Sequence, residues 1–351
     1  MDLLVLPGDG IGPEITDATV RVLRTADTRF RLGLSLSEDR IGLAALKAEG
    51  TTLPERVRER ALAADGVVLG PVSHNEYPPV AQGGINPSGA LRKQMQLYAN
   101  IRPARSRPGL PTPIARPVDL VVMRENLEGF YADRTMFAGG GEFMPVPGVA
   151  LAMRKITADG SRRIAEAAFA LAATRPARRV AAIHKQNVMR MSDGLFLDEV
   201  RAVAKAYPDI AYEEVLVDSA AALLVRAPER FDVLVTTNMF GDILSDLASE
   251  LAGGLGLAAS LNLGADHAVA QAQHGSAPDI AGKDLANPTS LIVSSAMLLR
   301  HLGATAAADA IEAAIDAALA HPETRTRDLG GALGTAAFAD TVSRLIEDIA
   351  P

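Results

Sequence analysis

The chain contains no cysteine and no tryptophan, and only 4% of its 351 residues are aromatic. The absence of cysteine excludes disulfides, thiolate metal ligands and cysteine nucleophiles, so carboxylates, histidines and lysines remain for any chemistry. No apolar run approaches the roughly 20 residues that a membrane-spanning helix needs. The N-terminus also lacks the basic flank and the small-residue cleavage site of a secretory signal. We therefore expect a cytoplasmic protein without a membrane partner.

The chain also lacks clustered positive charge, because its formal net charge is -7 and no run of lysine or arginine occurs. Binding to nucleic acid depends on clustered cations that displace counterions from phosphates, so nucleic acid is excluded as a partner. The length exceeds what one compact core usually organises, and this predicts two domains or one elaborate α/β unit.

Short leucine-rich or β-branched runs alternate along the chain with alanine-rich amphipathic stretches. This alternation predicts an α/β fold with a largely parallel sheet. We expect strands at residues 3–6, 66–69, 120–123, 180–183, 214–217 and 233–236, and a helix at 304–320. A proline-rich run at 102–117 is interpreted as a passage between lobes, and the stretch 137–147 (FAGGGEFMPVP) as an irregular excursion or a β-arm.

A glycine motif, PGDGIGPE at residues 7–14, follows the first expected strand. Gly8, Gly10 and Gly12 resemble the Rossmann dinucleotide fingerprint, but the third glycine is displaced and no acidic strand end follows about 20 residues later. Two interpretations stay open. The motif is either a tight turn that brings backbone amides to a ligand, or a purely structural turn between strand and helix.

Three arginines, Arg92, Arg102 and Arg124, lie beside apolar strand-like runs. Guanidinium groups bind carboxylates in bidentate fashion, so a converging set predicts a site for a di- or tricarboxylate. Solvated surface arginines are the alternative. Arg124 stands at the carboxyl end of a strand, where crevices form in α/β folds, and Tyr131 lies close enough in sequence to donate a proton there.

Three aspartates form the next candidate group. Asp218 is expected to end a strand, and Asp242 and Asp246 follow another strand at a helical i, i+4 spacing. Their oxygens are ligands that Mg²⁺ or Mn²⁺ prefers, although Asp242 could instead cap a helix. Lys185, just past an apolar strand, is a candidate base or an ordinary surface lysine.

The stretch 274–288 (HGSAPDIAGKDLANP) is a polar loop before an expected helix, and it either wraps a nucleotide or merely connects two elements.

With these motifs in this order, the chain resembles the β-decarboxylating dehydrogenases, a family that acts on isopropylmalate, isocitrate, homoisocitrate or tartrate. The matching blocks are LPGDGIGPE, LRKQMQLYANIRP, RENLEGFYADR, HKQNV, TTNMFGDILSD and HGSAPDIAG. The resemblance implies a two-domain α/β fold with mixed sheets that is not a Rossmann fold. Residues 1–97 and 250–351 would form the large cofactor-binding domain, and 98–249 the small domain with the dimer interface and an arm at about 134–157.

The resemblance also implies roles for the candidate residues. Arg92, Arg102 and Arg124 would hold the malate carboxylates. Tyr131 and Lys185 would be the acid/base pair, and Mg²⁺ or Mn²⁺ would bind Asp218, Asp242 and Asp246. In this family the lysine and the first aspartate come from the neighbouring subunit, which implies a homodimer with shared active sites.

The resemblance further implies the cofactor. Asp279 stands where NAD enzymes of the family carry an acid for the adenosine ribose, and a carboxylate there repels the 2′-phosphate of NADP. NAD is therefore the expected cofactor. The residues expected to contact it are Ile11, His274, Gly275, Ser276, Ala277, Asp279 and Asn287.

Substrate choice in this family depends on the segment before the first arginine. Isopropylmalate enzymes carry apolar residues at the positions of Ser88 and Gly89, whereas Asn86 and Ser88 make this segment polar. Isocitrate or homoisocitrate is therefore the expected substrate, with 3-isopropylmalate, tartrate and malate as alternatives. A noncatalytic regulatory subunit is the alternative from another class, and the presence of the catalytic groups argues against it. Departures from the family pattern are Leu127, Leu247 and the AQAQ that precedes the cofactor loop.

Overall fold

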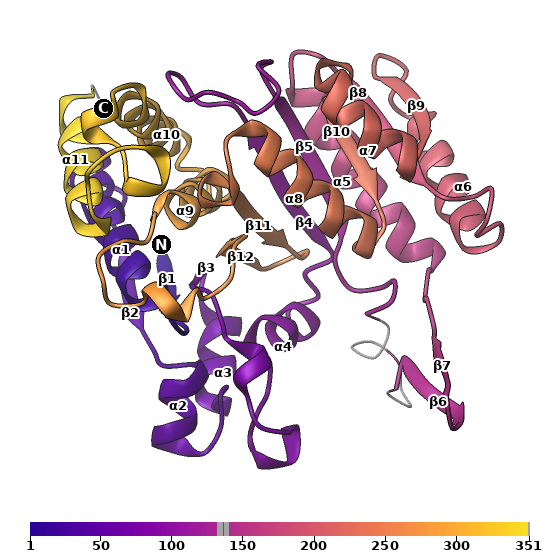
Figure 1. The fold of residues 1–351 in the computed structure, drawn as a ribbon, viewed down its shortest axis with the longest axis horizontal. Coiled ribbons are helices and arrows are strands. Elements are labelled where there is room, and N and C mark those ends of the chain that lie inside the picture. Colours follow the sequence, from indigo (N-terminus) through magenta and orange to yellow (C-terminus); the bar gives the residue numbers. More distant parts are fainter. Residues whose placement is uncertain (132–135, 137–139, 350–351) are drawn as a thin grey trace.

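A computed structural model describes residues 1–131, 136 and 140–349. Within them one ten-stranded sheet runs through the molecule in the order β2-β1-β3-β12-β11-β4-β5-β10-β8-β9 (Figure 1). Its strands are β1 (Asp2–Leu6), β2 (Ser35–Glu38), β3 (Gly66–Leu69), β4 (Ala99–Arg105), β5 (Asp119–Glu125), β8 (Arg179–His184), β9 (Ala211–Leu216), β10 (Val233–Thr236), β11 (Ala259–Leu263) and β12 (Ala268–Ala272).

The sheet is parallel toward both edges and antiparallel at its centre. Strand β4 pairs antiparallel with both β5 and β11, and β11 pairs antiparallel with β12. The predicted mixed α/β architecture is confirmed. The expected strand at 214–217 is wrong at its end, because Val217 already begins helix α7 (Val217–Arg226). The run 102–117 completes β4 and then leads to the adjacent strand β5, and its expected role as a passage between lobes stays a prediction.

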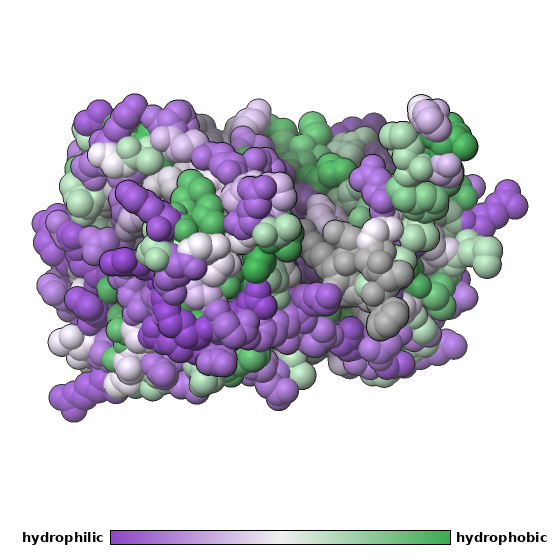
Figure 2. All heavy atoms as spheres, turned by 90° about the horizontal axis from the view of Figure 1, so that it is seen from below, coloured by the Kyte–Doolittle hydropathy of each residue, from purple (hydrophilic) through white to green (hydrophobic). Residues whose placement is uncertain are grey.

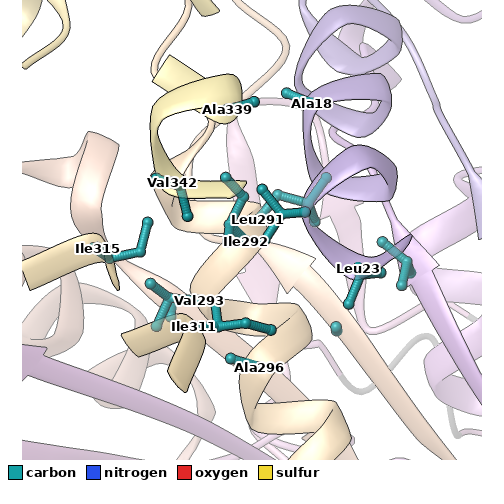
Figure 3. Close-up of a cluster of buried hydrophobic side chains, with 14 of the residues drawn as sticks. Ala18, Leu23, Leu291, Ile292, Val293, Ala296, Ile311, Ile315, Ala339 and Val342 are labelled. Atoms are coloured by element: carbon teal, nitrogen blue, oxygen red, sulfur yellow. The ribbon is translucent and has the colours of Figure 1, made fainter. Parts of the chain in front are cut away.

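Helices cover both faces of the sheet (Figure 1). Those from the two chain ends are α1 (Gly12–Phe30), α2 (Gly42–Glu49), α3 (Glu55–Ala63), α4 (Pro87–Gln94), α9 (Thr289–His301), α10 (Thr305–Ala320) and α11 (Thr335–Asp348). Figure 3 shows Leu23 of α1, Ile292 of α9, Ile311 of α10 and Val342 of α11 converging in one buried core. Burial of such side chains is the main favourable contribution to this packing. The helix expected at 304–320 is confirmed.

The middle of the chain builds its own cores. Helices α5 (Ala158–Thr174) and α6 (Ser192–Ala204) bury Phe169 and Phe196 against the sheet, and α7 and α8 (Asn238–Ala252) bury Leu224 and Leu244 elsewhere in this half. These separate cores support the predicted division at about 97 and 250, which we keep as a proposal. The second boundary falls inside α8, whose Leu251 still packs in a middle core.

A two-stranded hairpin stands away from the body of the molecule (Figure 1). It consists of β6 (Glu142–Val146) and β7 (Val149–Ala152), paired antiparallel. This is the expected β-arm, although residues 134, 135 and 137–139 of the predicted segment lie outside the described residues. None of the helices in the described part of the chain combines the length and the apolar character that a bilayer crossing requires.

Candidate active site

A pocket of about 290 Å³ lies where β4, β5, β12, α4 and α8 meet. The residues predicted from the sequence that line it are Asn86, Ser88, Arg92, Arg102, Arg124, Tyr131, Asp242, His274 and Gly275. Neither Lys185 nor Asp218 is among the lining residues. The fold therefore brings together the expected carboxylate-binding set, but leaves part of the expected catalytic set elsewhere.

Two of the arginines are fixed in the wall of the pocket. Arg102 and Arg124 come from the neighbouring strands β4 and β5 and are buried, so they are not solvated surface residues. Both donate to the Asp242 carboxylate, Arg102 over 3.1 Å. Burial and the neighbouring charge of Arg124 lower the pKa of Arg102 to about 10, which still leaves it charged at neutral pH. The wall thus presents two positive charges to an anionic ligand.

Two asparagines that the sequence interpretation missed hold these guanidinium groups. Asn238 Oδ1 accepts hydrogen bonds from Nε and Nη2 of Arg124, at 3.0 and 2.6 Å. Asn100 Oδ1 accepts from Nε of Arg102 at 2.5 Å. A signal was present, because Asn100 lies two residues before Arg102 and therefore shares its face of the strand. Buried hydrogen bonds of this kind preorganise the arginines for a ligand.

Asp242 lies inside helix α8, whose N-cap is Thr237, so the capping interpretation is excluded. It accepts a hydrogen bond from the Tyr131 hydroxyl at 3.2 Å. Burial raises the pKa of Asp242, but the charges of Arg124 and Arg102 lower it more, and the net direction is downward. The carboxylate is therefore ionised at neutral pH, which is the form that a divalent cation binds.

One chain brings together only two of the three predicted metal ligands. Asp246 lies one helical turn beyond Asp242, and carboxylate oxygens on one helix face suit Mg²⁺ or Mn²⁺. Across residues 1–131, 136 and 140–349 no cluster of three His, Cys, Asp or Glu side chains is placed to hold a metal. Asp218 does not end a strand as expected. It lies in the first turn of α7, where its side chain is 62% exposed and bonds Lys185.

Lys185 follows β8 and forms an ion pair with Asp218 outside the pocket. The hydrogen bond from Lys185 lowers the pKa of Asp218. Arg154, at the base of the hairpin, anchors the same region by donating to Ser192, Asp193 and Thr237. These hydrogen bonds fix the segment that carries Lys185, because Asp193 also accepts from the Lys185 N–H.

The glycine motif packs against the expected cofactor loop. Gly10 has a left-handed φ of +58°, and a Cβ there would lie 2.0 Å from the Ser276 carbonyl oxygen. The Ile11 N–H donates to that oxygen at 2.8 Å, and the hydroxyls of Ser276 and Ser73 are 2.8 Å apart. Of the two interpretations left open, the structure favours the structural one, because the Ile11 amide is engaged by the loop.

The same motif carries Asp9, which the sequence interpretation did not single out. Its buried carboxylate accepts from the N–H of Leu43 at 2.7 Å, from the N–H of Ser73 at 3.0 Å and from the Tyr77 hydroxyl. Asp9 thereby ties the glycine motif to the first turn of α2 and to the segment 73–77, which itself contacts the cofactor loop through Ser73.

The residues expected to contact NAD differ in burial and in hydrogen bonding. His274 Nε2 is buried and has no hydrogen-bond partner among the residues that the structure describes. Burial also lowers the pKa of His274, so the ring is neutral. Ala277 is partly exposed, and Asp279 lies exposed at the outer end of the loop. Asn287 is buried. It accepts a hydrogen bond from the Thr289 N–H and donates one to Asp328, each with a length of 3.0 Å.

An orphaned buried nitrogen beside an open glycine is a fitting environment for a heterocyclic ligand such as adenine. A Cβ added at Gly275 would meet no atom of the described part of the chain within 4 Å. The loop therefore fits a nucleotide near His274 and Gly275, whereas Asn287 already makes one donated and one accepted hydrogen bond within the protein.

Comparison with known proteins defines the class. Residues 2–342 match the family model described as isocitrate/isopropylmalate dehydrogenase. The isocitrate/homoisocitrate dehydrogenase of Thermus thermophilus is 42% identical over 349 residues, which cover 99% of each chain. The 3-isopropylmalate dehydrogenase of Methanothermobacter thermautotrophicus is 40% identical over 348 residues, again 99% of each. A solved isocitrate dehydrogenase from Methylococcus capsulatus has a TM-score of 0.89 and 40% identity, covering 99% of both chains.

The chain is therefore an NAD-dependent decarboxylating dehydrogenase by its family and fold, and this prediction is confirmed. The chain belongs to the isocitrate/isopropylmalate dehydrogenase family. NAD and a divalent cation, Mg²⁺ or Mn²⁺, are the cofactors of this family, and its substrates are hydroxy-carboxylates. Relatives named for isocitrate and for isopropylmalate match almost equally well, so the comparisons leave the individual acid open.

Proposed function

We propose that the chain oxidises and decarboxylates isocitrate or homoisocitrate with NAD. The observation that carries this proposal is the polar wall beside Arg92. Ser88 Oγ and Arg92 Nη2 both donate to Gln271 Oε1, over 3.1 and 3.2 Å, at the end of the pocket where an isopropyl group would need apolar contacts. Asn86 contributes less than expected, because its side-chain oxygen caps α4 by accepting from the Gly89 N–H at 3.2 Å.

The pocket residues take the following roles. Arg92, Arg102 and Arg124 hold the substrate carboxylates, and Tyr131 returns a proton to C3 after loss of carbon dioxide. The partner subunit's Lys185 takes the proton of the C2 hydroxyl. When bound, the divalent cation polarises the C2 oxygen and NAD accepts the hydride.

In this proposal the remaining residues form two cofactor sites. Asp242 and Asp246, with the partner subunit's Asp218, hold the cation. The loop from His274 to Asp279, whose Ser276 carbonyl accepts from the Ile11 N–H, holds NAD, and Asn287, held by Asp328, lies at the end of the same stretch.

The homodimer belongs to the proposal because a single chain leaves the site incomplete. Apolar side chains are exposed on the small domain, where a partner could cover them. Figure 2 shows apolar side chains on the side of the molecule that carries this domain. Among the exposed apolar side chains of this domain are Met191, 90% exposed, Ile243, 59% exposed, and Phe143, Met144 and Val146 of the hairpin. Large apolar side chains that stay exposed in this way are candidates for contact with a partner.

The first test is NADH formation by the purified protein with Mg²⁺ or Mn²⁺ on isocitrate, homoisocitrate, 3-isopropylmalate, malate and tartrate. The highest kcat/KM is expected with one of the two tricarboxylates. A preference for 3-isopropylmalate would overturn the proposed substrate. Inactivity on all five acids, in protein shown to be folded and dimeric, would favour the regulatory-subunit alternative.

Shared active sites are tested by mixing two inactive variants, Lys185→Met and Asp242→Asn. A mixed dimer would contain one doubly damaged site and one intact site. Random exchange should therefore restore about one quarter of the wild-type activity. Two different affinity tags would verify that mixed dimers have formed. If verified mixed dimers stay inactive, the sites are not shared.

A further inference from the structure

Gln271 is a pocket residue whose side-chain amide is oriented by two hydrogen-bond donors. It lies on β12 and faces the helix α4 that carries Ser88 and Arg92. Arginine has donors only, so the Gln271 amide must turn its oxygen toward Arg92. The two hydrogen bonds then occupy both lone pairs of that oxygen. The amide nitrogen is left on the opposite side with two N–H donors.

This nitrogen is available to a ligand. Gln271 lines the pocket and is only partly buried, and among the described residues its Nε2 donates no hydrogen bond. Ser88 has no hydroxyl proton left to donate to a ligand, because it donates that proton to Gln271. A carboxylate that enters this end of the pocket can therefore accept a hydrogen bond from Gln271, while Ser88 acts through Gln271.

We propose that Gln271 is a specificity-determining residue whose amide N–H binds the third carboxylate of the substrate. This inference rests on the proposed function. Ser88 is then a positioning residue that, with Arg92, fixes the amide. An isopropyl group in the same place would leave the Nε2 donors of Gln271 without a partner, and an enzyme site discriminates strongly against a substrate that leaves its polar groups unpaired.

The neutrality of residue 271 is central to this role. A glutamate at this position would attract the proton donors of Ser88 and Arg92 equally well, but it would offer no N–H donor. Its charge would also oppose the third carboxylate and partly neutralise Arg92. An amide, in contrast, satisfies both neighbours and still donates to an anion.

The experiment compares Gln271→Glu and Gln271→Leu with the wild type on isocitrate, homoisocitrate, 3-isopropylmalate and malate. For Gln271→Glu, kcat/KM should fall roughly 100-fold on the tricarboxylates and clearly less on malate, which has no third carboxylate. For Gln271→Leu, the ratio of isocitrate to isopropylmalate activity should fall by at least about tenfold. Equal losses on all four acids would overturn the proposal.

Gln273→Glu is the matched control. Gln273 lies two residues further along and donates to Asp246 at 2.7 Å, so a charge there adds to the same pocket without touching Ser88. It should lower activity on all four acids by a similar factor. A selectivity change as large as that of Gln271→Glu would mean that any added charge produces the effect, and would also overturn the proposal.

A double-mutant cycle of Ser88→Ala and Gln271→Leu tests whether the two residues act as a unit. Their losses of tricarboxylate activity should combine to less than the product of the single effects. Independent effects would remove the positioning role of Ser88. The two proposals fail differently: a wild-type preference for isopropylmalate defeats the proposed substrate, whereas a tricarboxylate preference that survives both Gln271 variants defeats only the role of Gln271.

Discussion

Replacing Gly10 by alanine would add a methyl group directly against the loop proposed to bind NAD. The new Cβ would lie 2.0 Å from the Ser276 carbonyl oxygen, whereas real Cβ atoms essentially never approach closer than 3.0 Å. Either the glycine turn or the loop must therefore move by at least about 1 Å. The hydrogen bond from the Ile11 N–H to the same oxygen, now 2.8 Å, would be lost or distorted.

The expected effect follows from that displacement. Misplacement of a binding group by about 1 Å can cost about 100-fold in an enzyme, so kcat/KM for NAD should fall by about that factor in Gly10→Ala. The backbone contributes separately, because φ is +58° and a left-handed alanine costs roughly 1 kcal/mol of stability. This second cost must be separated from the effect on the cofactor.

Gly33→Ala provides the separation. Gly33 has a φ of +66°, but no atom of the described residues lies within 4 Å of its added Cβ. It should lose the same roughly 1 kcal/mol of unfolding free energy while its NAD kinetics stay within about twofold of the wild type. The assay is the KM for NAD together with the NADH dissociation constant from NADH fluorescence, which no tryptophan of the chain can disturb. Equal NADH affinity in both variants would refute the reasoning.

Two further predictions concern buried charge. Burial raises the pKa of Glu125 to about 7, although the N–H groups of Leu127 and Glu128 oppose this. Buried Glu125 favours its protonated form in the folded protein. The stability that this form contributes is fully present below pH 4.5, the pKa of a glutamate in the unfolded chain, and is lost as the pH rises through about 7. Glu125→Gln should flatten that part of the curve of Tm against pH, and superimposable curves would contradict this. Asp242→Asn removes the carboxylate that Arg102 and Arg124 share. The free energy of unfolding measured in urea should fall by about 2 kcal/mol. This is less than for a fully buried pair, because the Asp242 side chain is 37% exposed. Asp246→Asn, which lies 3.5 Å from Arg102, should cost clearly less, and equal losses would count against the shared-partner argument.

Part of the secondary structure was predicted from the sequence, because the information for these elements is local. Apolar runs with a period of two or of 3.6 residues located five strands of the sheet and helix α10. The i, i+4 spacing correctly placed Asp242 and Asp246 on one helix face. The end of β9 was not predictable in this way, since an apolar residue such as Val217 suits both a strand end and a helix start.

The candidate site was predicted as a set of residue types, and the arginines do meet in one pocket. The sequence by itself determined these types, their order and the family they indicate. Only the tertiary structure decided how the residues are held: Asn238 fixes Arg124 across 114 positions of the chain, and Ser88 meets Gln271 across 183. The physical reason is that local patterns specify which face of an element is buried, whereas the partner of a buried polar group depends on which distant element packs against it.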